Sequence, residues 1–66
     1  MNINLNGKQT IVKDKTTITE LLIQLKITPE LVACELNLKI IKRKEYSTTL
    51  LKEKDQLEIL QMIGGG

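Results

Sequence analysis

The sequence predicts one α+β domain, in which a mixed four- to five-stranded sheet packs on one main helix. Short segments of alternating polar and apolar residues, which are typical of strands, lie on both sides of a single segment with helical periodicity. The chain of 66 residues is too short for a second domain. It has one cysteine and no histidine, so it has no internal disulfide and no typical zinc site. The core therefore has to be aliphatic.

The N-terminal segment predicts a β-hairpin. Residues 2–5 alternate as a half-buried strand does, and residues 8–13 return as a second strand. The pair Asn6-Gly7 between them is typical of a type I′ turn, because both central residues of that turn have positive φ. With these two residues in the loop, Ile11 points away from the core. The residues expected on the buried face are Ile3, Leu5 and Val12.

One helix is expected after the hairpin. Thr17 and Glu20 have the capping-box pattern, in which each side chain accepts a hydrogen bond from the other residue's backbone N–H. The apolar residues that follow recur at spacings of i, i+3, i+4 and i+7, as on one face of a helix. We expect the helix to run from about Ile18 to Lys26 and to be ended by Pro29. The stripe consists of Ile18, Leu21, Leu22 and Leu25, with Ile23 outside it.

The second half of the chain predicts the remaining strands. Residues 31–36 form the third strand, Ile40-Ile41 a short fourth strand, and residues 56–63 the last strand. Residues 42–47 are expected to be irregular or a helical turn. The expected buried residues are Val32, Cys34, Leu36, Leu57, Ile59 and Ile63, and the opposite face of the last strand carries Glu58, Leu60 and Met62. If the first and last strands lie side by side in the middle, this mixed sheet over one helix is a β-grasp.

Composition excludes several classes of function. Without histidine there is no Ser-His-Asp triad and no His-ligated metal. The net charge of +2 is too small to imply nucleic acid by itself. No run approaches the roughly 20 apolar residues of a membrane span. The first residues contain no apolar signal segment, and a lone thiol fits a reducing compartment, so we expect a cytoplasmic protein that does not bind membranes and is a monomer by itself.

The C-terminal glycines, Gly64, Gly65 and Gly66, are the most unusual feature of the sequence. A frayed end is the simplest interpretation. However, a glycine tail is thin enough to enter a narrow channel in a partner and to present its terminal carboxylate there. ATP could convert this carboxylate into an acyl adenylate, from which a sulfur or nitrogen nucleophile displaces AMP. The chain has no phosphate-binding loop motif, so a partner would have to supply the ATP site. It would then be a co-substrate and not an enzyme.

The full sequence resembles the sulfur carrier protein of thiamine (thiazole) biosynthesis, a small ubiquitin-like family. The resemblance rests on a start of the form I-x-L-N-G, on the helix entry T-x-x-E-L-L, on the stretch V-A-x-E-x-N and on the glycine ending. Lys42 departs from the family, which often has proline at this position before the arginine. The residues that match are Ile3, Leu5, Asn6, Gly7, Thr17, Glu20, Leu21, Leu22, Val32, Ala33, Glu35, Asn37, Ile40, Ile41, Arg43, Asp55, Gly65 and Gly66.

The resemblance implies a mechanism. An E1-like adenylating enzyme activates the carboxylate of Gly66 with ATP, and no cofactor is bound by the chain itself. Sulfur that a cysteine desulfurase provides then replaces AMP and leaves a thiocarboxylate. Thiazole synthase receives this sulfur. Gly64, Gly65 and Gly66 would form the tail, residues 64–66, that enters the partner's active site.

A docking surface is expected beside the tail. Leu60 and Met62 lie on the non-core face of the last strand, and exposed apolar residues near a reactive end suggest a partner patch. We expect Ile41 to extend this patch and Glu58 to contact a basic partner.

The remaining polar and reactive residues have simpler interpretations. Cys34 alternates with core residues, so we interpret it as a core residue and not as a sulfur acceptor. Glu53 and Asp55 are expected to be solvated turn residues. The basic residues Lys39, Lys42, Arg43 and Lys44 are more typical of steering towards an acidic partner than of nucleic-acid binding, because Tyr46 is the only aromatic residue.

Other functions remain open at this point. The small subunit of molybdopterin synthase uses the same thiocarboxylate, but that family is usually longer. Conjugation to other proteins through an isopeptide bond is a variant of the same chemistry. The chain could also be an interaction module or an RNA-associated β-grasp module with an inert tail.

Overall fold

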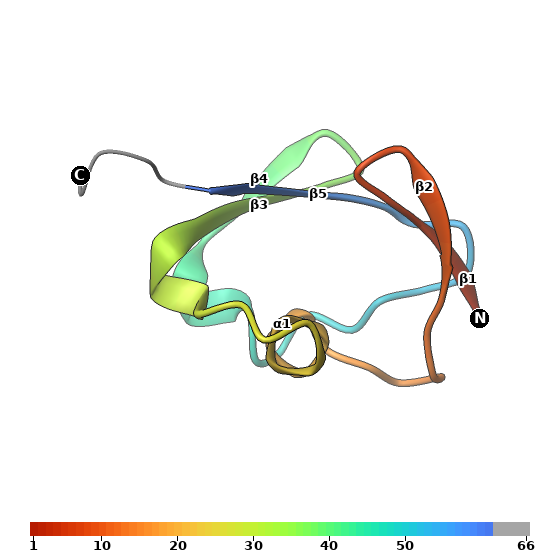
Figure 1. Cartoon of the computed structure of the whole chain (residues 1–66), viewed down its shortest axis with the longest axis horizontal. Helices are drawn as coiled ribbons and strands as arrows, with labels where there is room; N and C mark the ends of the chain where they lie inside the picture. The colour runs from red at the N-terminus through yellow and green to blue at the C-terminus, as the bar shows by residue number, and fades with distance from the viewer. Residues whose placement is uncertain (62–66) are drawn as a thin grey trace.

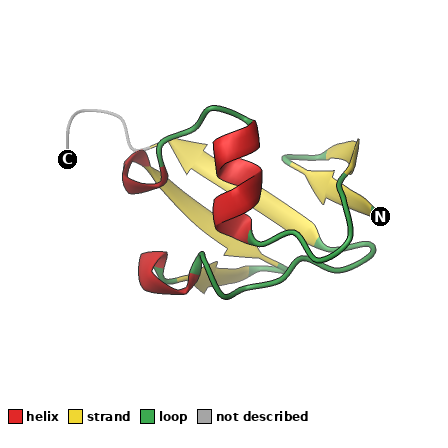
Figure 2. Ribbon diagram, turned by 90° about the horizontal axis from the view of Figure 1, so that it is seen from below, coloured by secondary structure: helices red, strands yellow, loops and turns green. Residues whose placement is uncertain are grey.

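In a computed structural model, which describes residues 1–61, the chain forms a five-stranded sheet with one α-helix across one face (Figures 1 and 2). The layers are one sheet and one helix, as the sequence predicts. In chain order the elements are β1 (Asn2–Leu5), β2 (Lys8–Ile11), α1 (Ile18–Gln24), the 3₁₀ turn η1 (Pro29–Leu31), β3 (Val32–Leu36), β4 (Lys39–Ile41), the 3₁₀ turn η2 (Arg43–Glu45) and β5 (Gln56–Gln61).

The strand order is β2-β1-β5-β3-β4, so β5 is the middle strand of the sheet. It pairs in parallel with β1 and antiparallel with β3. The predicted β-grasp arrangement, with the first and last strands side by side, is therefore confirmed. As a consequence, the strand that leads to the C-terminus is supported by a neighbour on each side.

The hairpin between β1 and β2 has the predicted turn. Asn6 and Gly7 both have positive φ, 50° and 82°, as a type I′ turn requires. Asparagine tolerates this backbone region better than most residues, and glycine adopts it without strain. Ile3 and Val12 are buried and Ile11 is 83% exposed, which confirms the predicted faces of the hairpin.

The helix begins as predicted and ends earlier than predicted. The Thr17 hydroxyl accepts from the Glu20 N–H at 3.1 Å, and Glu20 Oε1 accepts from the Thr17 N–H at 2.9 Å. The last helical residue is Gln24 and not Lys26. Lys26 has a φ of 60°, and the N–H of Ile27 bonds to the carbonyl of Leu22 at 2.9 Å. This is the Schellman motif, in which a residue in the left-handed region ends a right-handed helix. Pro29 lies beyond this point, so the prediction that it ends the helix is wrong.

Pro29 instead opens η1, which includes Leu31. For that reason the third strand starts at Val32, one residue later than predicted. The fourth strand and the helical turn after it occur where they were expected.

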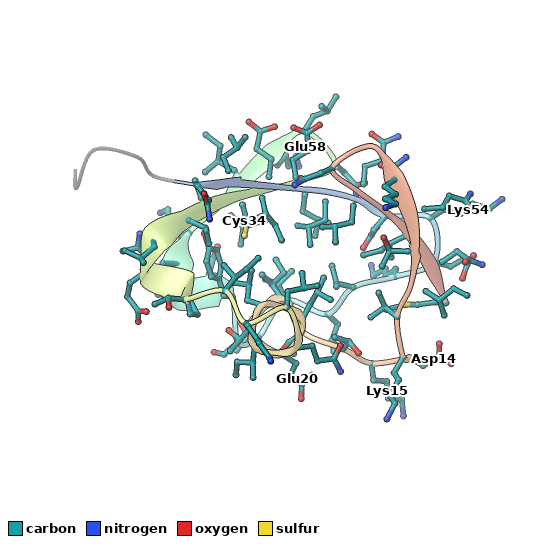
Figure 3. The ribbon with its side chains drawn as sticks, in the orientation of Figure 1. Asp14, Lys15, Glu20, Cys34, Lys54 and Glu58 are labelled. Carbon is teal, nitrogen blue, oxygen red and sulfur yellow. The ribbon has the colours of Figure 1, made fainter. Side chains whose placement is uncertain are left out.

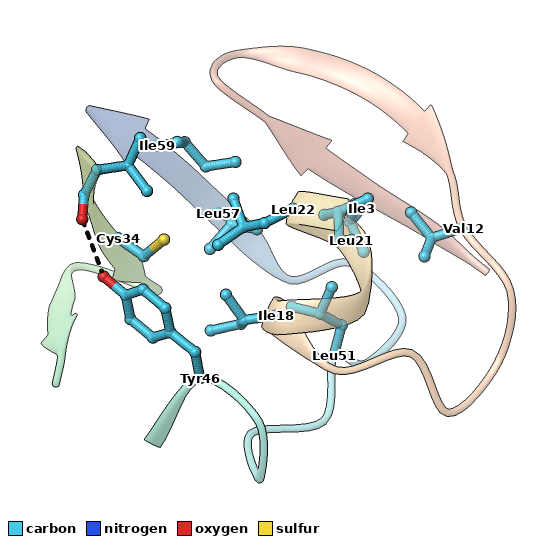
Figure 4. Close-up of a cluster of buried hydrophobic side chains, with 11 residues drawn as sticks. Ile3, Val12, Ile18, Leu21, Leu22, Cys34, Tyr46, Leu51, Leu57 and Ile59 are labelled. Atoms are coloured by element: carbon cyan, nitrogen blue, oxygen red, sulfur yellow. Dashed lines mark hydrogen bonds between the residues drawn. The ribbon is translucent and has the colours of Figure 1, made fainter. Parts of the chain in front are cut away.

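The core fills the space between α1 and the inner face of the sheet (Figure 4). Cys34 and Leu57 are 0% exposed, so their predicted burial is confirmed. Tyr46 is also buried, and its hydroxyl donates to the Val32 carbonyl at 3.4 Å. The core residues are Ile3, Val12, Ile18, Leu21, Leu22, Val32, Cys34, Tyr46, Leu51, Leu57 and Ile59.

Asp55 is not the solvated turn residue that the sequence predicts. It is 8% exposed and accepts from the Lys52 N–H at 2.7 Å and from Asn37 Nδ2 at 3.0 Å. Asn37 Oδ1 accepts from the Gln56 N–H at 2.9 Å. These bonds fix the start of β5, because they satisfy the backbone N–H groups of Lys52 and Gln56, and Gln56 lies beyond the end of the pairing with β3.

Candidate functional site

The predicted site lies at the C-terminal end of β5. Gln61 is the last described residue, and in Figure 1 this end of β5 lies at the opposite end of the molecule from the N-terminus. The predicted tail, Gly64, Gly65 and Gly66, lies outside the described residues, and so do Met62 and Ile63. The site can therefore be described as the surface that surrounds the base of the tail.

Leu60 and Glu58 are exposed on the sheet face that the helix does not cover, where they were predicted. Leu60 is 50% exposed. Figure 3 shows Glu58 on the outer side of the sheet, whereas Cys34 points into the space between sheet and helix. The alternation of β5 produces this separation, since successive side chains of a strand point to opposite faces.

Ile41 does not belong to this outer surface. It pairs with Cys34 in the register of β3 and β4, is half-buried and packs against the core. Its neighbour Ile40 pairs with Glu35 and is 76% exposed, so Ile40 occupies the outer position that was assigned to Ile41. The correction is a shift of one residue, which in a strand moves a side chain to the other face.

The strand register assembles an outer-face patch across β5, β3 and β4. Leu60 is opposite Ala33, Glu58 is opposite Glu35, and Glu35 is opposite Ile40. The patch thus combines apolar side chains with two carboxylates. We use the name outer-face patch for Ala33, Glu35, Ile40, Glu58 and Leu60.

The predicted basic residues lie in and directly after the edge strand β4. Lys39 is in β4, Lys42 precedes η2, and Arg43 and Lys44 are in η2. All four are exposed. Tyr46, the only aromatic residue of the sequence, is 3% exposed, so no aromatic ring is presented for base stacking.

Cys34 is not available as a surface nucleophile. Its side chain is buried in the core, and burial raises the pKa of its thiol above the ordinary value of 9.0, with a smaller opposing effect from the Tyr46 hydroxyl. Burial likewise raises the pKa of Tyr46 above 10.0. Since the thiolate is the reactive form, Cys34 is inert near neutral pH.

Residues 1–61 present neither a metal-binding cluster nor a membrane-spanning helix. No group of three or more Cys, Asp and Glu side chains is arranged to hold a metal ion in this part of the chain. None of its helices has the length and apolar character needed to cross a membrane.

The side chain of Asn6 makes a contact with β5 that the sequence does not predict. Asn6 was interpreted as a turn residue, but its side chain also bonds to β5. Asn6 Oδ1 accepts from the Ile59 N–H at 2.7 Å, and Asn6 Nδ2 donates to the Ile59 carbonyl at 3.3 Å. No local pattern could predict this pairing, because the two residues are 53 positions apart in the sequence.

Known proteins resemble the chain in sequence. The sequence model of the ThiS family matches residues 2–66. The sulfur carrier protein ThiS of Bacillus subtilis is 35% identical over 65 residues, which cover 97% of this chain and 98% of that protein. The thiazole synthase of Magnetococcus marinus is 41% identical over 66 residues, and that of Paramagnetospirillum magneticum is 33% identical over 66 residues. The chain spans only 20% of the length of each of these two synthases.

A solved structure has the same fold. The crystal structure of the thiamine biosynthesis protein ThiS from Geobacter metallireducens superimposes with a TM-score of 0.86 at 38% identity, and the match covers 100% of both chains. The mixed sheet over a single helix is thus the ubiquitin-like β-grasp of that protein. The match extends over the full chain in both sequence and fold, and we conclude that the chain belongs to the ThiS family, the family of the sulfur carrier protein of thiamine biosynthesis.

Proposed function

We propose that this chain, a sulfur carrier of the ThiS family, holds sulfur as a thiocarboxylate on Gly66. An E1-like adenylating enzyme transfers AMP from ATP to the Gly66 carboxylate and releases pyrophosphate. A thiol reductant releases sulfide from the persulfide of a cysteine desulfurase and is itself oxidised to a disulfide. The sulfide attacks the acyl carbon, and AMP leaves with the bonding electron pair. The chain is a co-substrate in this scheme, and ATP binds to the partner. The compartment is the cytoplasm, where the Cys34 thiol stays reduced.

The observation that carries the proposal is the central position of β5 in a ThiS-family fold. Because β1 and β3 both pair with it, β5 has a fixed position from which the following residues extend. Five residues follow Gln61, and a chain of five residues reaches at most about 18 Å. A partner that acts on Gly66 therefore has to dock close to the end of β5.

The outer-face patch is suited to this docking. Leu60 is next to Gln61 and keeps half of its surface exposed, so a partner can cover it with apolar side chains. Glu35 and Glu58 favour a partner with basic groups opposite them.

Thiazole synthase is the proposed sulfur acceptor. Two proteins named thiazole synthase contain a stretch that is similar to the whole chain, which supports a functional pairing of the two activities. In the proposed transfer the thiocarboxylate sulfur moves to the thiazole precursor, and an oxygen atom from the precursor or from water takes its place on the acyl carbon, which regenerates the Gly66 carboxylate. A purified thiazole synthase should accept sulfur from the loaded chain in a single turnover.

Intact mass spectrometry tests the first half of this scheme. The protein ending at Gly66 is incubated with a ThiS-adenylating enzyme, ATP and a sulfur donor. We expect a gain of about 16 Da, since one oxygen is replaced by sulfur through an activated acyl intermediate. Omission of ATP or deletion of Gly66 should abolish the gain, while circular dichroism of the deletion variant stays unchanged. An unchanged mass of the full-length chain would disprove the proposal.

A pair of surface variants tests the docking step. Leu60→Asp should raise the KM for the adenylating enzyme by about tenfold, because it places a charge in the centre of the interface. Ile11→Asp is the matched control, since Ile11 is also an exposed aliphatic residue but lies in the edge strand β2. If both variants raise the KM equally, the outer-face patch is not the docking surface.

A further inference from the structure

The side chain of Asn6 extends the pairing between β1 and β5. The backbone ladder runs from the Asn4 N–H, which bonds to Asp55 at 2.8 Å, to the Asn6 N–H, which bonds to Leu57 at 2.9 Å. In a regular parallel ladder the next bond would join the Ile59 N–H to the backbone carbonyl of Asn6. The chain instead turns away at Asn6, where φ is 50°.

The side-chain amide takes over that role. Asn6 Oδ1 accepts from the Ile59 N–H at 2.7 Å, and Asn6 Nδ2 donates to the Ile59 carbonyl at 3.3 Å. One amide group thus satisfies both backbone groups of Ile59, as a residue of a neighbouring strand would do. Both bonds are partly buried, which shields them from competition with water.

This contact lies where β5 loses its neighbour on one side. Pairing with β1 covers Gln56 and Leu57, whereas pairing with β3 continues as far as Gln61. The Asn6 amide adds support on the β1 side up to Ile59, next to Leu60 of the outer-face patch. Gly66 follows Ile59 by seven residues. The amide therefore holds β5 close to the base of the tail.

We propose that Asn6 is a positioning residue for the acyl-transfer chemistry at Gly66. By holding Ile59, it fixes the direction in which β5 leaves the sheet relative to the docked outer-face patch. When the strand that carries the tail is held in one direction, the terminal carboxylate reaches the partner's active site in a productive orientation more often than when that strand end can pivot. This inference rests on the proposed function, because it concerns delivery of the same terminal group.

Two substitutions separate the hydrogen bonds of the Asn6 side chain from the role of Asn6 in the turn. Asn6→Gly removes the side-chain amide, while glycine adopts the positive φ of this position without strain. Asn6→Asp keeps an oxygen that can accept from the Ile59 N–H but has no donor for the Ile59 carbonyl. Aspartate also tolerates the left-handed region. Thr17→Ala is the control for lowered stability, because it removes the helix cap at a site outside β5.

The test measures kcat and KM for thiocarboxylate formation together with amide hydrogen exchange. We expect Asn6→Gly to lower kcat by about tenfold with KM changed less than about twofold, since misorientation affects the reactive step more than docking. Asn6→Asp should be intermediate. In Asn6→Gly the backbone amide of Ile59 should exchange faster than in the wild type. In Thr17→Ala this amide should keep its protection relative to other core amides, and kcat should equal the wild-type value.

The outcomes are distinguishable. Unchanged kcat in Asn6→Gly, or an equal loss in Thr17→Ala, would overturn the positioning role while wild-type turnover still supports the proposed function. Absence of turnover with the wild-type chain would overturn the proposed function itself, and the positioning role with it.

Discussion

Two leucines in β5 lie three residues apart and on opposite faces of the sheet. Leu57 is 0% exposed and faces the helix, between Leu5 of β1 and Leu36 of β3. Leu60 is 50% exposed on the outer face. The same substitution, leucine to alanine, should therefore have different effects at the two positions. This contrast tests the register on which the outer-face patch depends.

The expected magnitudes follow from burial. Leu57→Ala loses the transfer free energy of the deleted atoms and leaves a cavity, which together lower the free energy of unfolding by about 3–5 kcal/mol. The strands around it are held by ladder hydrogen bonds and cannot collapse into the space. Leu60→Ala leaves no cavity, and its half-exposed side chain contributes less than about 1 kcal/mol.

Urea unfolding followed by circular dichroism measures both changes. A domain of this size has a total stability of about 3–10 kcal/mol, so Leu57→Ala removes much of it. Leu57→Val is the variant to use if Leu57→Ala is unfolded in buffer, and it should cost about 1 kcal/mol. Equal losses for Leu57→Ala and Leu60→Ala would refute the assignment of the two faces of β5.

Three further predictions concern the scaffold. Thr17→Ala should lower the free energy of unfolding by about 1 kcal/mol, measured by urea titration, because the N–H of Glu20 loses its capping partner. Asp55→Ala should lower the free energy of unfolding by about 1–3 kcal/mol, since the Lys52 N–H and the Asn37 amide lose their acceptor. Surface substitutions usually change stability by less than about 0.5 kcal/mol, so a loss below that value would contradict the buried network. Burial raises the pKa of Cys34 above 9.0 and that of Tyr46 above 10.0, so the folded state binds these protons more tightly than the unfolded chain does. The stabilisation that results is complete below pH 9.0 and is lost as the pH rises through the pKa values of the folded state. Unfolding titrations from pH 8 to about 11 should therefore show a decline in the free energy of unfolding, and this decline should be shallower in Tyr46→Phe.

Much of the fold was predictable because its signals are local. The Asn6-Gly7 turn, the Thr17–Glu20 capping box and the alternation of the strands each depend on residues close in sequence. The same alternation predicted the exposure of Leu60 and the burial of Cys34.

The parts of the candidate site that could not be predicted depend on pairing between distant segments. Whether Ile40 or Ile41 faces outward depends on the register of β4 against β3, and a segment with two adjacent isoleucines gives no alternation to decide it. Asp55 has the composition of a surface turn and becomes buried because Asn37, 18 residues earlier, meets it in space.

The sequence by itself determined the type and order of the strands and the helix, and it singled out the terminal glycines as the candidate reactive group. Only the tertiary structure decided that β5 lies between β1 and β3, that Ile40 joins Leu60 and Glu58 on one face, and that the Asn6 amide holds Ile59. The physical reason is that propensity and alternation act between neighbours along the chain, whereas strand order and side-chain-to-backbone hydrogen bonds are selected by packing of the whole domain.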